Sequence, residues 1–241
     1  MYRTASERPR RRAGRTTWDV RSPHTPTEGV HYLVRRSEEV LDALPVAAPD
    51  REAAAELPPW RALEHAASRT LLRALLREIG EDLGGGPVAA RPSGRPYLPD
   101  RPDLGVSLSH SSGWVAAAVA LDRDVGIDVQ TPRAVGDRLL RLCCTPGDAE
   151  ALAALPESSR RREFAWIFTT QEACVKATGT GFAGRPWTVP VTLGQRTGAW
   201  EQVRWCAPRD AQPVPAGCAW TGPRGPGGVF RQVGAGGGDG L

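Results

Sequence analysis

Asp128 and Gln130 stand two residues apart in residues 126–130 (GIDVQ), a segment that favours a β-strand. Because strand side chains alternate between faces, the two would share one face, with Cα atoms about 6.6 Å apart. Two oxygen-bearing side chains at that spacing can share a hard cation or its water shell. The alternative is a half-buried strand with a wet polar face, and the strand alone favours this alternative.

Glu172 and Lys176 are four residues apart and would lie on the same face of a helix. Of the 31 basic residues, Lys176 is the single lysine, and an ammonium can give up a proton, which a guanidinium does not readily do. One alternative is a surface ion pair worth about 0.3–0.5 kcal/mol. Another is a capping box in which Thr169 and Glu172 begin a helix.

Ser109-His110-Ser111 follows a short apolar segment. Hydroxyls, an imidazole and loop backbone suit a phosphate group, but a histidine with satisfied hydrogen bonds in a turn is the simpler interpretation. A serine hydrolase is disfavoured, because no G-x-S-x-G elbow surrounds either serine.

The elements that must position these residues form a mixed pattern, which predicts an α+β fold rather than a doubly wound sheet. Helical spacing covers residues 38–44, 63–79 and about 159–178, and a further helix is expected to begin at Thr145. Strands are expected at residues 30–34, 106–109, 114–121 and 125–129, with short strands within 187–233. Residues 122–124 have the length of a hairpin connection.

The composition, with 40% apolar and 24% charged residues among 241, is that of a globular protein of one large or two small domains. The longest uncharged apolar run, residues 114–121, is far shorter than the roughly 20 residues of a membrane span. We therefore expect no transmembrane helix, no secretory signal and a cytoplasmic protein. The cysteines form no C-x-x-C pair, which argues against zinc, and we interpret Cys143, Cys144, Cys174, Cys206 and Cys218 as small buried residues.

Basic charge gathers in residues 1–36, which hold nine arginines and three acidic residues. We expect a disordered basic arm (1–28), an N-terminal subdomain (29–112), a C-terminal subdomain with the metal and catalytic motifs (113–233) and a flexible tail (234–241). Because the body outside the arm is not basic, a nucleic-acid-binding protein is the weaker alternative.

In this order and spacing the motifs resemble the 4′-phosphopantetheinyl transferases of the larger, pseudo-dimeric class, which activates surfactin synthetase and other peptide and polyketide synthetases. That family shows a G-K-P-Y-like loop, S-H-S, G-I-D-[VI]-E and W-[ST]-x-K-E-A-x-x-K-x-x-G-x-G-L. The segments that match are residues 69–72 (RTLL, resembling the first helix motif), 94–97 (GRPY), 109–111 (SHS), 126–130 (GIDVQ) and 168–182 (FTTQEACVKATGTGF).

The resemblance implies two similar α/β subdomains in a pseudo-twofold arrangement, with the coenzyme in the cleft between them. It implies an enzyme that uses Mg²⁺ or Mn²⁺ to transfer the phosphopantetheine arm of coenzyme A to a serine of an acyl or peptidyl carrier protein, with release of 3′,5′-ADP. Asp128, Gln130 and Glu172 would then hold the metal. Glu172, or a water that it orients, would take the serine proton, and Lys176 would meet the α-phosphate and the leaving oxygen.

For coenzyme A, the resemblance implies that Ser109, His110 and Arg95 surround the 3′-phosphate and that Arg69 and Thr70 face the nucleotide. Carrier proteins of this family's reactions are acidic around the modified serine, so a basic docking face is expected, with residues 160–162 (three arginines) as candidates or, equally, a solvated helix end. The resemblance further implies a monomer that binds no membrane.

Three positions depart from the family pattern. Gln130 replaces a glutamate, Gln171 replaces a lysine and Phe168 replaces a tryptophan. The first change predicts weaker metal binding, the second removes a cation near the cleft, and the third keeps an apolar anchor. These changes keep open the alternative of a weak or inactive family member that binds coenzyme A or a carrier protein.

Overall fold

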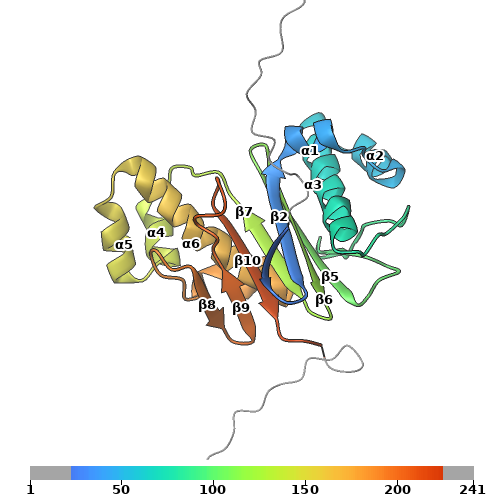
Figure 1. The fold of residues 1–241 in the computed structure, drawn as a ribbon. Coiled ribbons are helices and arrows are strands. Elements are labelled where there is room, and N and C mark those ends of the chain that lie inside the picture. Colours follow the sequence, from blue (N-terminus) through green and yellow to red (C-terminus); the bar gives the residue numbers. More distant parts are fainter. Residues whose placement is uncertain (1–22, 225–241) are drawn as a thin grey trace, which may run out of the picture.

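Two antiparallel sheets lie between two helical layers (Figure 1). The computed structural model describes residues 23–224. The first sheet has the order β1-β2-β6-β5, built from β1 (His24–Thr27), β2 (Val30–Arg36), β5 (Leu104–Ser111) and β6 (Trp114–Leu121). The second has the order β7-β10-β9-β8, built from β7 (Val125–Val129), β8 (Thr197–Trp200), β9 (Val203–Cys206) and β10 (Ala216–Thr221).

Each sheet carries its own helices, and Figure 1 shows the two sets on opposite sides of the molecule. Over the first sheet lie α1 (Ser37–Ala43), α2 (Ala48–Ala55) and α3 (Pro59–Glu78), with the small ribbon of β3 (Ala89–Ala90) and β4 (Pro96–Tyr97) at its edge. Over the second lie α4 (Asp137–Cys143), α5 (Pro146–Ala153) and α6 (Glu157–Thr178), followed by the 3₁₀ turns η1 (Gly181–Gly184) and η2 (Pro186–Thr188).

A core between the two sheets decides which way β7 presents its side chains. Val125, Ile127 and Val129 are buried in this core together with residues of β2 and β6. Because neighbouring strand residues point to opposite faces, Gly126 and Asp128 must face away from this core, toward α6. The predicted alternation in residues 126–130 is thereby confirmed for Asp128.

Two glycines let α6 lie directly against the second sheet. A Cβ on Gly126 would overlap the carbonyl oxygen of Ala173 and lie 2.6 Å from the backbone nitrogen of Ala177. A Cβ on Gly217 of β10 would lie 2.6 Å from Cα of Thr170. The glycine that opens the GIDVQ segment therefore has a packing role: it brings the helix of Glu172 and Lys176 onto the strand of Asp128.

The sequence predicted several elements at or near their observed bounds. The strands at 114–121 and 125–129 are confirmed, as is the helix that ends before Gly179, a left-handed cap with φ 74°. Thr145 caps α5 as expected, since its hydroxyl accepts the backbone N–H of Asp148 at 3.2 Å. The α+β class is confirmed, whereas the twofold relation between the halves stays a prediction. The helices α2 and α4 were not predicted.

Two predictions about the middle of the chain were wrong. Residues 122–124 do not form a hairpin, because β6 pairs with β2 and β5 while β7 pairs with β10 in the other sheet. The boundary expected between 112 and 113 was also too early, because β6 belongs to the first sheet. The chain changes sheets at 122–124, where Gly105 leaves room, since a Cβ there would overlap the carbonyl oxygen of Arg123.

The expected disordered arm ends too late, because β1, which pairs with β2, lies within residues 1–28. Residues 1–22 of that arm and the tail at 234–241 lie outside the described residues. Within residues 23–224, no helix combines the length and the apolar character that a bilayer crossing needs.

Candidate active site

Asp128 is the centre of the candidate site. Its Oδ1 accepts a hydrogen bond from Lys176 Nζ at 2.6 Å and another from Ser109 Oγ at 2.7 Å. The three side chains come from three elements, β7, α6 and β5, and Asp128 itself is only 9% exposed. A buried carboxylate with a cation and a hydroxyl on one oxygen keeps its second oxygen available for a ligand.

Lys176 is held on two sides. Besides the contact with Asp128, Nζ donates to the carbonyl oxygen of Ile127 at 3.0 Å. The side chain is 30% exposed, so the ammonium is fixed in place and still accessible. The alternative of a simple surface pair between Glu172 and Lys176 does not describe this geometry, because the lysine pairs with Asp128 across two elements.

Glu172 lies one turn before Lys176 on α6 and is half-buried. Its Oε1 is buried without a hydrogen-bond partner among the described residues. Burial raises the pKa of Glu172, the negative charge of Asp128 raises it further, and Lys176 opposes both effects. The charge of Asp128 thus disfavours the ionised form of Glu172, and a bound cation would oppose that effect.

The capping box considered for Thr169 and Glu172 is wrong. Both residues lie inside α6, which begins at Glu157. The Thr169 hydroxyl instead donates to the carbonyl oxygen of Ala165 at 2.8 Å. Glu172 is thus free of any capping role.

The donor set beside Asp128 fits a magnesium ion that is also bound by its substrate. Within residues 23–224, no three His, Cys, Asp or Glu side chains are grouped to hold a metal. Asp128 and Glu172 supply two carboxylates, and strand alternation places the amide of Gln130 on the face of Asp128. Mg²⁺ commonly takes one or two protein carboxylates, with phosphate oxygens and waters completing its shell. The unpartnered Oε1 of Glu172 is the observation that supports this fit.

A row of serines on β5 joins the two sheets. Ser107, Ser109 and Ser111 alternate along the strand, and their hydroxyls accept backbone N–H groups of β7 and the residues after it. The pairs are Ser107 with Ile127 at 3.1 Å, Ser109 with Val129 at 3.3 Å and Ser111 with Thr131 at 3.1 Å. The side chains thus replace a strand partner along the edge of β7, and they fix Ser109 against Asp128.

Ser109 and His110 do not share one ligand site. As neighbours in a strand they point to opposite faces, so Ser109 binds Asp128 while His110 turns toward α3. There the Nδ1 of His110 lies 2.8 Å from Glu64 Oε2. The expectation that both residues contact one phosphate needs correction for Ser109, whose hydroxyl serves Asp128 and β7.

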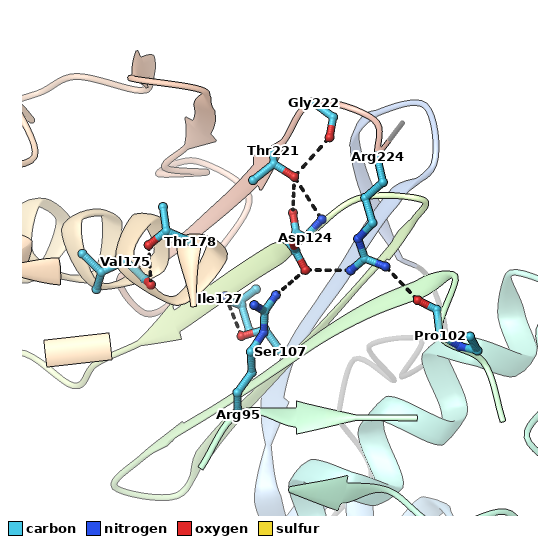
Figure 2. A network of polar contacts seen from close by, with 10 residues as sticks. All are labelled: Arg95, Pro102, Ser107, Asp124, Ile127, Val175, Thr178, Thr221, Gly222 and Arg224. Atoms are coloured by element: carbon cyan, nitrogen blue, oxygen red, sulfur yellow. Dashed lines mark hydrogen bonds and ion pairs between the residues drawn. The ribbon is translucent and has the colours of Figure 1, made fainter. Parts of the chain in front are cut away.

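Arg95 lies at the opposite end of β5 and β7. Its Nη2 donates to Asp124 Oδ1 at 2.6 Å, and Arg224 Nη2 donates to the same oxygen at 2.6 Å (Figure 2). The two guanidinium groups leave a net positive charge beside a cavity of about 510 Å³, which Arg91 and Tyr97 also line. Positive charge around a cavity of this size suits an anionic small molecule.

The structure separates Arg95 from His110. Val106, the lining residue of the cavity beside Arg95 that is nearest to His110 along β5, precedes it by four residues, a rise of about 13 Å. The expected group of Ser109, His110 and Arg95 around one phosphate stays a prediction. In the described contacts each residue has its own partner: Asp128 for Ser109, Glu64 for His110 and Asp124 for Arg95. Arg95 also lies against the end of α6, since a Cβ on Gly179 would be 2.7 Å from its Nη1.

Comparison with known proteins finds a similarity that covers part of the chain. Residues 124–211, which include Asp128, Glu172 and Lys176, match the model of the 4′-phosphopantetheinyl transferase superfamily. Over these residues the chain is similar to that superfamily. It is 35% identical over 130 residues to 4′-phosphopantetheinyl transferase HetI of Nostoc sp. strain PCC 7120, covering 50% of this chain and 55% of HetI.

Two Bacillus relatives match over a similar length. The identity is 25% over 123 residues to the 4′-phosphopantetheinyl transferase of Bacillus subtilis, covering 48% of this chain and 54% of that protein. It is 28% over 123 residues to 4′-phosphopantetheinyl transferase psf-1 of Bacillus pumilus, covering 48% and 52%. The chain thus spans about half the length of the curated relatives it matches.

Arg69 and Thr70, expected to face a nucleotide in a superfamily member, lie on α3. Thr70 is 1% exposed and its hydroxyl is buried, so it offers no surface to a ligand. Arg69 is partly buried: burial lowers its pKa, Asp50 opposes this, and Arg73 adds to it. The expectation is therefore wrong for Thr70 and remains a prediction for Arg69.

The departures from the superfamily pattern at Gln171 and Phe168 have packing explanations. Gln171 Nε2 donates to the carbonyl oxygens of Cys143 and Val189 at 2.8 and 3.1 Å, in the interior of the second half. It therefore removes no cation from the site, contrary to expectation. Phe168 packs against the buried core beside Phe164, with ring centroids 5.9 Å apart.

Sequence analysis missed three residues that contact or surround the predicted site residues His110 and Arg95. Glu64 pairs with His110, while Asp124 and Arg224 form the network around Arg95. No spacing connects these residues to their partners, which are 29 to 100 positions away. The alternating serines of residues 107–111 were the available signal for the edge between the sheets.

Proposed function

We propose that this chain transfers the 4′-phosphopantetheine arm of coenzyme A to a serine of an apo acyl or peptidyl carrier protein, releasing 3′,5′-ADP. The observation that supports the proposal is the contact of Asp128 with Lys176, one helical turn after Glu172, inside the segment that matches the superfamily. Two carboxylates and an ammonium meet the needs of phosphoryl transfer, which depends on positioning and charge neutralisation.

Lys176 supplies the fixed positive charge. The carboxylate of Asp128 and the carbonyl of Ile127 hold Nζ, and the ammonium has one further proton to donate. In the proposed reaction it meets the α-phosphate and donates to the oxygen that leaves with 3′,5′-ADP. A compact ammonium suits this role better than the arginines that dominate the chain.

Glu172 is the base of the proposed reaction. Its raised pKa brings the carboxylate closer to the range in which it exchanges protons readily. The serine hydroxyl loses its proton to Glu172, or to a water that Glu172 orients. The serine oxygen bonds to the phosphorus that carries pantetheine, and the bond from that phosphorus to the ADP oxygen breaks.

Asp128, Glu172 and Gln130 are the proposed ligands of a Mg²⁺ or Mn²⁺ ion. When bound, the ion would neutralise the pyrophosphate oxygens of coenzyme A as charge develops on them. Because Gln130 supplies an amide where a second acid would bring a charge, we expect weaker metal binding than a three-acid site would give.

Coenzyme A would lie along β5, from Arg95 at the start of the strand to His110 near its end. Arg95, with the cavity at the start of β5, and His110, at its end, flank Asp128 on either side, so they would contact separate parts of one extended ligand. We assign His110 to the 3′-phosphate. Ser109 acts indirectly, by fixing Asp128.

The acidic carrier protein would dock on the basic start of α6. A monomer of this chain would suffice for the reaction. Arg162 is exposed there, and Arg161 pairs with Glu157 on the same turn of the helix. We expect charge reversal of Arg162 to raise KM for the carrier without changing KM for coenzyme A.

The test is the mass of an apo carrier protein incubated with the full chain, coenzyme A and MgCl₂. The proposal predicts a mass gain of one phosphopantetheine arm and an equal amount of 3′,5′-ADP. Unchanged mass with several acyl and peptidyl carriers, while the chain still binds coenzyme A, would support a binding protein instead.

A further inference from the structure

Glu64 on α3 and His110 on β5 are in contact beside the candidate site. Nδ1 of His110 lies 2.8 Å from Glu64 Oε2, and the His110 side chain is 46% exposed while Glu64 is 16% exposed. The carboxylate is thus mostly enclosed, and the imidazole projects from it toward solvent.

The pair determines which ring nitrogen a ligand would meet. Because the carboxylate oxygen 2.8 Å away can only accept, Nδ1 is the ring nitrogen that its position favours for carrying a proton. Nε2 is the ring nitrogen on the side away from that contact, and it is left to face outward because the His110 side chain is 46% exposed. When the ring is protonated, Nε2–H is a charge-assisted donor of the kind that binds phosphate.

The surroundings leave Glu64 as the group that sets this orientation. In the first sheet the register partner of His110 is Val115, which is apolar, and the adjoining Ser109 and Ser111 turn to β7. Glu64 is the sole charged group that the described contacts place against the imidazole. Without it, the ring would rotate and exchange tautomers freely.

We propose that Glu64 is a positioning residue that orients His110 so that Nε2 meets the 3′-phosphate of coenzyme A. This rests on the proposed function, which supplies the ligand. Glu64 itself touches no part of the coenzyme. It acts as the carboxylate partners of ligand-binding histidines do, by fixing ring orientation and tautomer.

The experiment measures equilibrium binding of coenzyme A and of 3′-dephospho-coenzyme A to the full chain. We expect E64A and H110A each to weaken coenzyme A binding about tenfold, with dephospho-coenzyme A affected less than about twofold. The double variant should bind coenzyme A no more weakly than H110A alone, because the two residues act as one unit. In transfer assays E64A should raise KM for coenzyme A and leave kcat unchanged.

Two further variants separate orientation from structural damage. E64Q keeps an oxygen that accepts the Nδ1 proton, so it should recover most of the affinity. E81A, which breaks the partly exposed pair of Glu81 with Arg101 in the same half, should bind both ligands as the wild type does. Wild-type affinity in E64A, or an equal loss for both ligands, overturns the inference. A wild-type chain that binds no coenzyme A would contradict the proposed function instead.

Discussion

Asp128 Oδ1 and Lys176 Nζ are 2.6 Å apart, and this contact joins the edge strand of one sheet to the helix that covers it. It depends on Gly126, because any larger residue would push the helix away from the strand. The Asp128–Lys176 contact and the packing of α6 on the second sheet therefore depend on each other. A substitution that alters one should alter the other.

Replacement of Lys176 should abolish transfer while the fold remains. In K176A, Asp128 loses its cation and the leaving oxygen loses its donor, so we expect kcat to fall about a hundredfold or more. K176R should restore little, because the guanidinium is larger and does not give up a proton. Circular dichroism and the thermal midpoint report the fold. The control is R196A, which breaks the exposed Arg196–Asp210 pair; activity in K176A equal to that in R196A would refute the role of Lys176.

Because of Glu172, the free energy of unfolding of the metal-free chain should depend on pH. Since its pKa is raised above the ordinary 4.5 in the folded chain, the folded state binds the proton more tightly than the unfolded state. The contribution of Glu172 to the free energy of unfolding is therefore fully present below the pKa of the unfolded chain. It is lost as pH rises through the raised pKa of the folded chain. In EDTA, E172Q should therefore be more stable than the wild type at about pH 8, with a difference that shrinks toward about pH 4. Urea unfolding at both pH values measures this, and equal stability at the higher pH would count against it.

Gly126→Ala should damage the fold and the site together. The new Cβ would overlap the carbonyl oxygen of Ala173, so α6 must shift. We expect a loss of about 1–3 kcal/mol in the free energy of unfolding, with a larger fractional loss of transfer because Lys176 moves from Asp128. G147A on α5, where a Cβ meets nothing within 4 Å, is the matched control. Wild-type stability in G126A would show that the close approach is not required.

The strands around Asp128 were predictable because local pattern decides them. Alternation along residues 125–129 placed the carboxylate opposite the apolar core, and helical spacing placed Glu172 and Lys176 together on α6. In each case one face of the strand or helix must be buried, so the spacing of apolar residues along the sequence shows which way a polar side chain points.

The pairing between elements was not predictable in the same way. Residues 122–124 are short enough for a hairpin, yet the chain passes to another sheet because Ser107, Ser109 and Ser111 satisfy the edge of β7. The partners of His110 and Arg95 likewise come from segments far away in the sequence. Such contacts depend on tertiary packing and leave no local period.

Replacing Gln130 with glutamate should increase the affinity of the site for Mg²⁺. Q130E adds a carboxylate on the face of β7 that carries Asp128, so the Mg²⁺ concentration for half-maximal transfer should fall several-fold, since ligand charge sets affinity for hard cations. Titration of transfer activity with MgCl₂ measures the change. An unaltered Mg²⁺ dependence would mean that residue 130 does not touch the ion.

Electron paramagnetic resonance of Mn²⁺ tests the metal site most directly, because Mn²⁺ accepts the oxygen ligands that Mg²⁺ uses. With coenzyme A present, the wild-type chain is predicted to bind one Mn²⁺, and D128N and E172Q are each predicted to lose that bound signal while still folding. Mn²⁺ bound by both variants as tightly as by the wild type would contradict the account of Asp128 and Glu172 as the ligands.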